Sequence, residues 1–397
     1  MIQQAMSRRR LLACLFVVVV VAITSLVWLL RPADRGSDSP TDAARPSTPS
    51  TGIPVTTWLA ADPAGFERVT GPRTFVFPVD HGPHPTYQNE WWYFTGLLTD
   101  KSGKRFGYHV TFFRFGITAP GAPARESAWA AQSLYLAHFA LTDLEAGVHH
   151  AFERQARGAL DLAGAQSKPP AVWVGPWRFA SGDDGATWFT LSAREARFAL
   201  SLRLNAPTQY ILQGDRGFSQ KGPEPGQASY YYSAPRMASS GTLTFAGAEY
   251  TVAGETWWDR EWGSATLAAS QVGWDWFALR LHDGRSLMWY QLRAPSGEAD
   301  GFGRGVLIAD DGVRSFTAES MNLVATRHWT SPRTGATYPV GWTATLDSYP
   351  HVIAIDAMVD GQEIAHTVRY WEGAVIARNA TTGEVLGEGY MELVGYQ

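Results

Sequence analysis

The chain has almost no cysteine: Cys14 is the single thiol among 397 residues. One thiol cannot form a disulfide within a chain, and it cannot supply a zinc-finger ligand set. Because Cys14 lies inside an apolar N-terminal run, the folded part of the chain contains no cysteine that could act as a nucleophile. We therefore expect a fold stabilised by packing, and cysteine avoidance is compatible with an extracytoplasmic location.

Basic clusters and cofactor motifs are missing as well. The net charge is −4, and no basic block occurs outside the extreme N-terminus, so nucleic acid is not an expected partner. The histidines show no zinc-ligand spacing. There is no Walker loop, no strand-Gly-x-Gly-helix unit and no Gly-x-Ser-x-Gly elbow. We expect no metal and no cofactor, and a serine-hydrolase mechanism has no motif to support it.

The N-terminus is the one region with a long hydrophobic run. Arginines at positions 8–10 precede an apolar run over 11–30, which is long enough to span a bilayer as a helix and has no Ala-x-Ala cleavage site after it. The arginines should stay cytoplasmic. We predict a signal anchor over 1–30, with a cleaved signal as the alternative, and a Pro/Ser/Thr-rich flexible linker over 31–69. The folded part would then be held in the periplasm by an inner-membrane anchor.

The rest of the chain reads as short strands rich in large aromatic residues. The sequence contains 17 Trp, 15 Tyr and 19 Phe, residues that favour strands and also line apolar binding sites. Short β-prone runs separated by turn residues indicate an all-β fold of sandwiches or barrels. The clearest hairpin runs over 274–293, around an Asp283-Gly284 pair typical of a type I′ turn. The length predicts two domains, over 70–245 and 246–397.

The densest group of candidate chemical residues runs from Glu255 to Gly263. On a strand, Trp257, Asp259 and Glu261 share one face, whereas Trp258, Arg260 and Trp262 share the other. A carboxyl group among indole rings is partly desolvated, so its pKa rises and it becomes a usable general acid. An acid–arginine pair that closes a barrel end is the commoner use of such a cluster, so both interpretations stay open.

A second cluster surrounds Glu90. Glu90 and Trp92 share a strand face, and Glu90 could orient a ligand or pair with an arginine such as Arg114. A buried structural salt bridge is the commoner outcome for such a group.

Several separate motifs together resemble the AttH/carotenoid 1,2-hydratase (hydroxyneurosporene synthase) family. They occur in order from about Thr70 to Gln397 and comprise Asn89-Glu90-Trp91-Trp92-Tyr93-Phe94-Thr95-Gly96, Trp257-Trp258-Asp259-Arg260-Glu261-Trp262-Gly263, Trp274-Asp275-Trp276, Trp329 with Ser331-Pro332, and Gly389-Tyr390-Met391-Glu392-Leu393. The resemblance implies two lipocalin-like (calycin) antiparallel β-barrels and an apolar isoprenoid or lipid-like ligand. It also implies cofactor-independent addition of water to a C=C bond.

The resemblance assigns roles to individual residues. Asp259 would be the acid, with Glu261 or Glu90 assisting. The ligand would be bound by the aromatic side chains and one arginine of the two clusters, namely Trp91, Trp92, Tyr93, Trp257, Trp258, Trp262, Trp274, Trp276 and Arg260. The alternatives are a non-catalytic periplasmic binder of a lipid or isoprenoid that serves an ABC-type export system, and a hydrolase. An enzyme needs a carboxyl group facing an enclosed cavity, whereas a binder can have its carboxyl groups locked in ion pairs.

Overall fold

The structure is a computed structural model that describes residues 53–54, 63–123, 126–264, 267–268, 270–347 and 349–397. The predicted anchor over 1–30 and most of the predicted linker lie outside these residues. Within the described part of the chain, no helix combines the length and the apolar character that a membrane span requires. The described residues belong to one compact unit.

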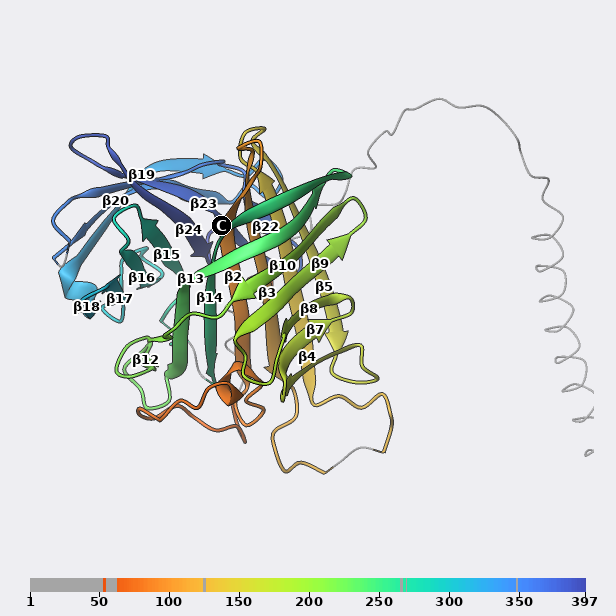
Figure 1. The fold of residues 1–397 in the computed structure, drawn as a ribbon. Helices are drawn as coiled ribbons and strands as arrows, with labels where there is room; N and C mark the ends of the chain where they lie inside the picture. The colour runs from red at the N-terminus through yellow and green to blue at the C-terminus, as the bar shows by residue number, and fades with distance from the viewer. Residues whose placement is uncertain (1–52, 55–62, 124–125, 265–266, 269, 348) are drawn as a thin grey trace, which may run out of the picture. The chain divides into compact units, whose positions relative to one another are not determined.

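The described residues form an all-β fold of two barrel-like sheets (Figure 1). Two short 3₁₀ turns make up the rest of the regular structure in this part of the chain. The first sheet is nearly closed, because β7 curls round to contact β3, β4 and β5. Its pairing order is β5-β4-β3-β2-β14-β13-β10-β9-β8-β7-β6, with β11 and β12 also paired to β13. The strands of this sheet are β2 (Asn89–Asp100), β3 (Arg105–Gly116), β4 (Ser133–Asp143), β5 (Val148–Arg157), β6 (Ala163–Ser167), β7 (Pro170–Val174), β8 (Trp177–Ser181), β9 (Trp188–Glu195), β10 (Phe198–Asn205), β11 (Ile211–Leu212), β12 (Phe218–Gln220), β13 (Ala228–Phe245) and β14 (Ala248–Gly263).

The second sheet is a half-barrel built from the C-terminal part of the chain. Its order is β18-β17-β16-β15-β24-β23-β21-β20-β19, with β1 and β22 also paired to β23. Its strands are β1 (Ile53–Pro54), β15 (Gly273–Leu281), β16 (Ser286–Arg293), β17 (Arg304–Ala309), β18 (Gly312–Thr317), β19 (Met321–Thr330), β20 (Thr337–Leu346), β21 (Ile353–Ala357), β22 (Glu363–Ala365), β23 (Val368–Asn379) and β24 (Val385–Val394). The two 3₁₀ turns are η1 (Val79–His81) and η2 (Ala318–Ser320).

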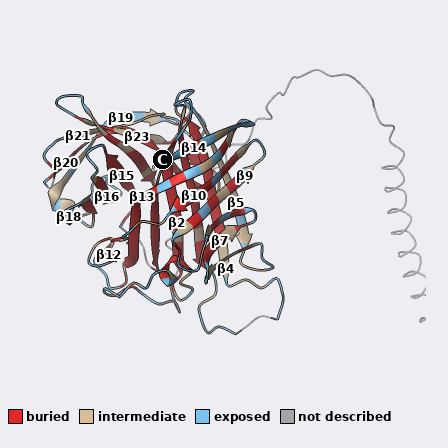
Figure 2. Ribbon diagram, in the orientation of Figure 1, coloured by how far each residue is buried: buried red, intermediate tan, exposed pale blue. Residues whose placement is uncertain are grey.

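Both faces of the central strands are buried, which gives the molecule three apolar layers (Figure 2). Alternate residues of β2, β3 and β14 fill the first barrel with large side chains such as Trp92 and Trp258. The second sheet encloses its own core, which includes Trp289 and Trp371. Between the two sheets lies a third layer, where the outer face of the first sheet contacts β15, β16, β23 and β24. This third layer holds the candidate site.

The two sheets approach each other closely at Gly107 on β3. A Cβ atom at this position would lie 2.6 Å from the hydroxyl of Tyr390 and 3.4 Å from the Cβ of Ala374, both on the second sheet. The first contact is too short unless the Tyr390 hydroxyl moves, whereas the second is an ordinary van der Waals contact. Glycine at position 107 therefore leaves room for the Tyr390 hydroxyl at the contact between the two sheets.

The change from one sheet to the other comes after β14, and not at the predicted domain boundary. Residue 246 falls in the turn between β13 and β14, and both strands belong to the first sheet. The aromatic cluster on β14 is therefore a wall of the first barrel that also faces the second sheet. The division into two domains itself stays a prediction.

The predicted hairpin over 274–293 is present as β15 and β16, but its turn differs from the predicted type. Gly284 has a φ of +90°, whereas Asp283 is not among the residues with positive φ. A type I′ turn needs positive φ at both central residues. The loop between Leu281 and Ser286 is longer than two residues, so one glycine in the left-handed region suffices.

Candidate functional site

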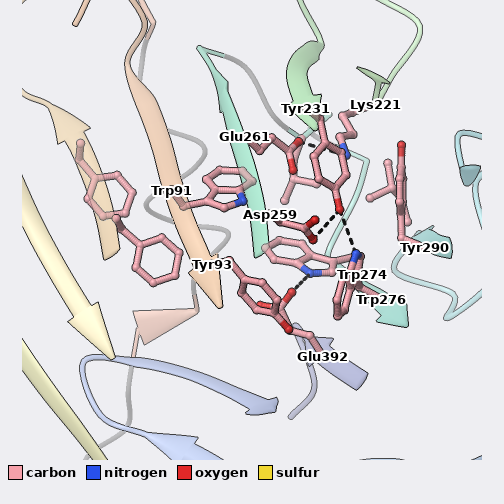
Figure 3. A pocket seen from close by; sticks show the side chains of 14 residues that line it. Trp91, Tyr93, Lys221, Tyr231, Asp259, Glu261, Trp274, Trp276, Tyr290 and Glu392 are labelled. Carbon is pink, nitrogen blue, oxygen red and sulfur yellow. Dashed lines mark hydrogen bonds and ion pairs between the residues drawn. The ribbon is translucent and has the colours of Figure 1, made fainter. Parts of the chain in front are cut away.

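A pocket opens between the outer face of the first sheet and the second sheet (Figure 3). The space that it offers to the centres of water-sized molecules is about 80 Å³. Aromatic and aliphatic side chains form most of its wall, and four ionisable side chains project among them. The lining residues are Trp91, Tyr93, Phe113, Phe115, Lys221, Tyr231, Asp259, Glu261, Leu267, Trp274, Trp276, Tyr290, Leu292 and Glu392.

Asp259 on β14 lies at the centre of this wall and is 3% exposed. Its Oδ1 accepts hydrogen bonds from Trp257 Nε1 at 2.8 Å and Ser233 Oγ at 2.5 Å, and its Oδ2 accepts one from Tyr231 Oη at 2.8 Å. Among the described residues, no Lys, Arg or His forms an ion pair with it. Burial therefore outweighs the three hydrogen bonds and raises the pKa of Asp259 to about 7.

Glu261 lies two residues further along the same face of β14, in a different electrostatic setting. It accepts a hydrogen bond from Ser229 Oγ, and Lys221 Nζ lies 3.2 Å from its Oε1. Burial is the largest single effect and works against the charge on Lys221, but Glu261 and Tyr290 together outweigh it, so the pKa of Lys221 is raised. Lys221 Nζ also lies 4.0 Å from the ring centroid of Tyr290. Glu261 is thus part of a buried ion pair at one end of the pocket.

Glu392 on β24 brings a second unpaired carboxyl group to the pocket from the second sheet. Its Oε2 accepts a hydrogen bond from Trp274 Nε1 at 2.8 Å. Burial, together with the nearby charges of Asp259 and Glu261, raises the pKa of Glu392 to about 7. Two carboxyl groups from opposite walls therefore titrate near neutral pH in one apolar pocket.

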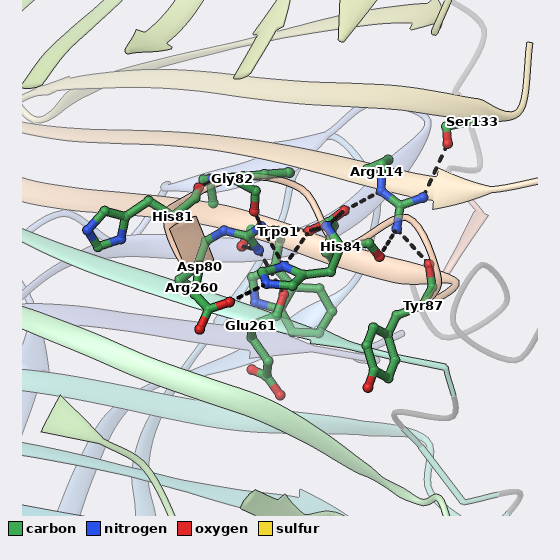
Figure 4. Close-up of polar contacts among 12 residues, drawn as sticks. Asp80, His81, Gly82, His84, Tyr87, Trp91, Arg114, Ser133, Arg260 and Glu261 are labelled. Carbon is green, nitrogen blue, oxygen red and sulfur yellow. Dashed lines mark hydrogen bonds and ion pairs between the residues drawn. The ribbon is translucent and has the colours of Figure 1, made fainter. Parts of the chain in front are cut away.

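The other face of β14 carries a different cluster, inside one end of the first barrel (Figure 4). Glu90 is fully enclosed there, with Arg260 Nη2 at 2.6 Å and Arg114 also in contact. Burial would raise the pKa of Glu90, but the charges of Arg114 and Arg260 hold it well below its usual range. Arg260 in turn lies over the ring of Trp92 at 3.7 Å. This arrangement is a buried ion-pair network in which two arginines share one carboxylate, and it includes the predicted pairing of Glu90 with Arg114.

The structure therefore brings together only some of the residues named from the sequence. Those that line the pocket are Trp91, Tyr93, Asp259, Glu261, Trp274 and Trp276. Trp257 lies behind the pocket wall, where it donates to Asp259 and packs against Trp276. The remaining residues lie on the other face of their strands, in the core or at the end of the first barrel, namely Glu90, Trp92, Trp258, Arg260 and Trp262.

Sequence reasoning missed several residues of the pocket. Tyr231 lies in a Tyr230-Tyr231-Tyr232 run on β13, opposite Glu261 in the strand register, so strand alternation applied to that run could have found it. Glu392 belongs to a C-terminal strand with clear alternation between Met391 and Leu393. Lys221 lies in an irregular segment after β12 and has no sequence signal.

The arrangement suits proton transfer to an apolar molecule. A carboxyl group with a pKa of about 7 is substantially protonated near neutral pH and can donate a proton, while its ionised form can accept one. Aromatic faces around it stabilise positive charge that develops on a bound molecule. The described residues contain no group of three or more side chains suited to a metal ion.

Comparison with known proteins defines the family. A family model described as AttH-like matches residues 68–396, and the chain therefore belongs to the AttH-like family. A solved AttH structure from Nitrosomonas europaea is 34% identical, with a TM-score of 0.75, and the match covers 84% of this chain and 100% of that chain. A search of curated proteins gives no match.

Two more distant solved structures share the fold. Kievitone hydratase from Nectria haematococca is 14% identical with a TM-score of 0.63, and the match covers 83% of this chain and 96% of that chain. A structure of CghA with Sch210972 is also 14% identical, with a TM-score of 0.50, and the match covers 85% of this chain and 96% of that chain. At this identity the likeness concerns the fold alone.

Proposed function

We propose that this protein is a cofactor-independent hydratase that adds water to a C=C bond of an apolar, isoprenoid or lipid-like substrate held between the two sheets. The observation that carries the proposal is Asp259: a buried carboxyl group in an aromatic pocket, with its pKa raised to about 7 and no cationic partner among the residues that the structure describes. Family membership and the hydratase named among the structural relatives support the proposal at the level of the fold.

The proposed reaction begins with Asp259 in its protonated form. Its proton forms a new C–H bond with one alkene carbon, and the other carbon becomes a tertiary cation next to the carboxylate. The faces of Trp276 and Tyr231 stabilise this cation. Water then forms the C–O bond. As Glu392 accepts the surplus proton of the water on one oxygen, it gives its own proton to the Asp259 carboxylate from the other. The sum is alkene plus water giving alcohol, with both carboxyl groups restored.

Glu261 has a supporting part in this scheme. Its ion pair with Lys221 and its bond from Ser229 fix it as a charged group at the end of the pocket. That charge raises the pKa of both Asp259 and Glu392. Glu261 is therefore a positioning residue that keeps the two acids protonated at higher pH.

A non-catalytic lipid binder is the second candidate, and one observation favours it. Both oxygens of Asp259 already accept hydrogen bonds from protein groups, three in total. A carboxyl group held in this way can serve to fix the pocket wall. In that case the same apolar cavity would carry a lipid or isoprenoid without changing it, as a partner of an ABC-type export system.

We propose further that the two sheets are lipocalin-like (calycin) barrels held in the periplasm. The arginines at 8–10 and the apolar run over 11–30 support an inner-membrane anchor. Fractionation of cells that produce the full chain, followed by N-terminal sequencing, tests this. Mature protein that begins after residue 30 in the soluble fraction would replace the anchor with a cleaved signal.

The test of the reaction compares the full-length protein from its native host with Asp259→Asn. Mass spectrometry of extracted ligand, after incubation in H₂¹⁸O, should show a product carrying one ¹⁸O atom with the wild type and only its unhydrated precursor with Asp259→Asn. Glu255→Gln is the matched control, because Glu255 lies on the same strand but bonds Arg236 outside the pocket. The same unmodified lipid from all three proteins would exclude hydration and leave the binder.

A further inference from the structure

A chain of polar side chains leads from the pocket, through the contact between the two sheets, to the outer edge of the first sheet. It begins at Tyr93 on β2, which lines the pocket and donates to Glu372 Oε1 at 2.8 Å. Glu372 on β23 is 1% exposed. Its second oxygen, Oε2, faces His109 Nδ1 on β3 at 3.8 Å, and neither atom has a hydrogen-bond partner among the described residues.

The chain continues from the other side of the His109 ring. His109 Nε2 lies 3.2 Å from Tyr370 Oη on β23 and 3.0 Å from Thr111 Oγ1 on its own strand, and Tyr370 Oη lies 2.7 Å from His138 Nδ1 on β4. His138 Nε2 lies 3.0 Å from Glu153 Oε2 on β5. Glu153 is partly exposed, with 11% of its side chain accessible, so the chain ends at solvent.

We propose that Glu372, His109, Tyr370 and His138 form a proton path between the pocket and Glu153 at the surface. The role of this path rests on the proposed function, because an apolar substrate that fills the pocket mouth leaves the pocket carboxyl groups without water. The path would bring solvent protons as far as Tyr93 in the pocket wall, through its hydrogen bond to Glu372, while the mouth is closed.

The protons can be placed so that each group in the chain, from Glu372 to Glu153, donates a hydrogen bond to the next. Burial and the nearby Glu392 raise the pKa of Glu372 well above its usual range, so Glu372 carries a proton to share with His109 Nδ1. His109 Nε2–H then donates to Tyr370 Oη, which donates to His138 Nδ1. His138 Nε2–H donates to Glu153, whose pKa is lowered to about 2, because the bonds from His138 and Thr367 outweigh burial.

The transfer balances with one proton at each step. Glu372 passes its proton to His109 Nδ1 while Nε2–H passes to Tyr370, whose own proton passes to His138 Nδ1. The Nε2 proton of His138 then passes to Glu153. Glu372 ends ionised, Glu153 ends protonated, and both histidines have changed tautomer without gaining charge. This matters because burial lowers the pKa of both rings, so neither histidine holds a second proton readily.

The unpaired contact between Glu372 and His109 is the point at which the path opens and closes. A buried polar atom without a partner is unfavourable, and two such atoms facing each other gain by approaching. The other titratable groups beside these residues are Glu392 and Asp259 near Glu372, His149 near His109, and His366 near His138. None of these side chains forms a hydrogen bond with Glu372 Oε2 or His109 Nδ1 within the described part of the chain.

The experiment follows proton exchange and does not need turnover. Infrared spectroscopy of the purified full chain, mixed rapidly into D₂O, observes the C=O stretching bands of buried protonated carboxyl groups, one of which is expected to belong to Glu372. Glu372→Gln should remove that band and so assign it. The pocket is filled with squalene as an apolar probe, and the rate at which the band shifts on deuteration is the readout.

Tyr370→Phe removes the hydroxyl at the centre of the path and keeps the ring. We expect it to lose the fast phase of deuteration and retain only the slow exchange that local opening allows. Tyr338→Phe is the matched control, since Tyr338 is also buried and bonds Glu363 in the core of the second sheet. Its exchange should equal that of the wild type. Should Tyr370→Phe fail to fold, His138→Gln interrupts the same path at its next step.

Three outcomes would overturn the path. Fast exchange in Tyr370→Phe shows that protons reach Glu372 by another way. Equal slowing in Tyr338→Phe shows a general effect of losing a buried hydroxyl. A spectrum that is unchanged in Glu372→Gln shows that Glu372 carries no proton. Because none of these results depends on a hydrated product, they are distinct from a failure of the proposed reaction.

Discussion

Replacing Asp259 by Asn should change the way in which stability depends on pH. The pKa of this group is 3.8 in its unperturbed form and about 7 in the folded protein. Between these values the folded state binds more protons than the unfolded state, so the free energy of unfolding falls as pH rises. The sign is opposite to that of a salt-bridged carboxylate, because here the folded pKa is raised.

The magnitude follows from the width of the window. One pKa unit corresponds to about 1.36 kcal/mol, so between pH of about 5 and the folded pKa near 7 Asp259 removes roughly 3 kcal/mol of stability from the wild type. Asn cannot titrate, so its stability curve should be flatter by that amount. The amide of Asp259→Asn fits the three hydrogen-bond donors less well than a carboxyl group, which costs about 1–3 kcal/mol. Above pH 7 the variant also avoids burying a charge, and this gain should offset that cost. The variant should then equal or exceed the wild type in stability.

Urea unfolding measured by tryptophan fluorescence at several pH values from about 5 to about 8 provides the comparison. The variant Glu255→Gln should keep the full slope of the wild type, because its side chain bonds Arg236 at the rim of the sheet. The variant Asp259→Asn should keep a shallower slope, because Glu392 still titrates near pH 7. Parallel curves for wild type and Asp259→Asn would refute the claim that burial holds this carboxyl group protonated.

Three further perturbations separate the pocket from the rest of the fold. Glu392→Gln should lower kcat with little change in KM, and steady-state kinetics on the identified substrate check this. Trp276→Ala should cost about 3–5 kcal/mol in the free energy of unfolding and admit bulkier ligands, measured by urea unfolding and by ligand extraction. Arg260→Met should cost a similar 3–5 kcal/mol, because it leaves Glu90 with a single cation, yet the ligand extracted from the folded fraction should be unchanged.

Strand alternation was enough to predict the division of the β14 cluster into two faces. Trp257, Asp259 and Glu261 do lie together, and Arg260 lies opposite them with Glu90. The sequence could not show which face meets a cavity, because both faces carry tryptophan and both are buried. In a sheet with one buried face, polar residues show which face is exposed to solvent. Here the second sheet covers the outer face of the first, so polar residues do not distinguish the two faces.

The second acid escaped prediction for a different reason. Glu392 is 133 positions from Asp259 in the numbering and reaches the pocket through the pairing of β24 with β15, which puts it opposite Trp276. Which strands of two separate sheets face each other depends on packing distances such as the one Gly107 permits. No local pattern contains that information. A single sequence therefore identifies the acid on its own strand but not the partner across the pocket.

The position of the pocket follows from how the two barrels are filled. Lipocalin-like barrels suggest a ligand inside the barrel, but large side chains such as Trp92, Trp177 and Trp258 occupy the first interior and Trp289 and Trp371 the second. Protein cores of this kind are close-packed, which leaves no room for an apolar ligand. The proposed ligand site is therefore built on the outer faces, where it needs one wall and one acid from each sheet. Neither sheet alone could then complete the proposed site, and the proposed reaction depends on keeping both sheets together.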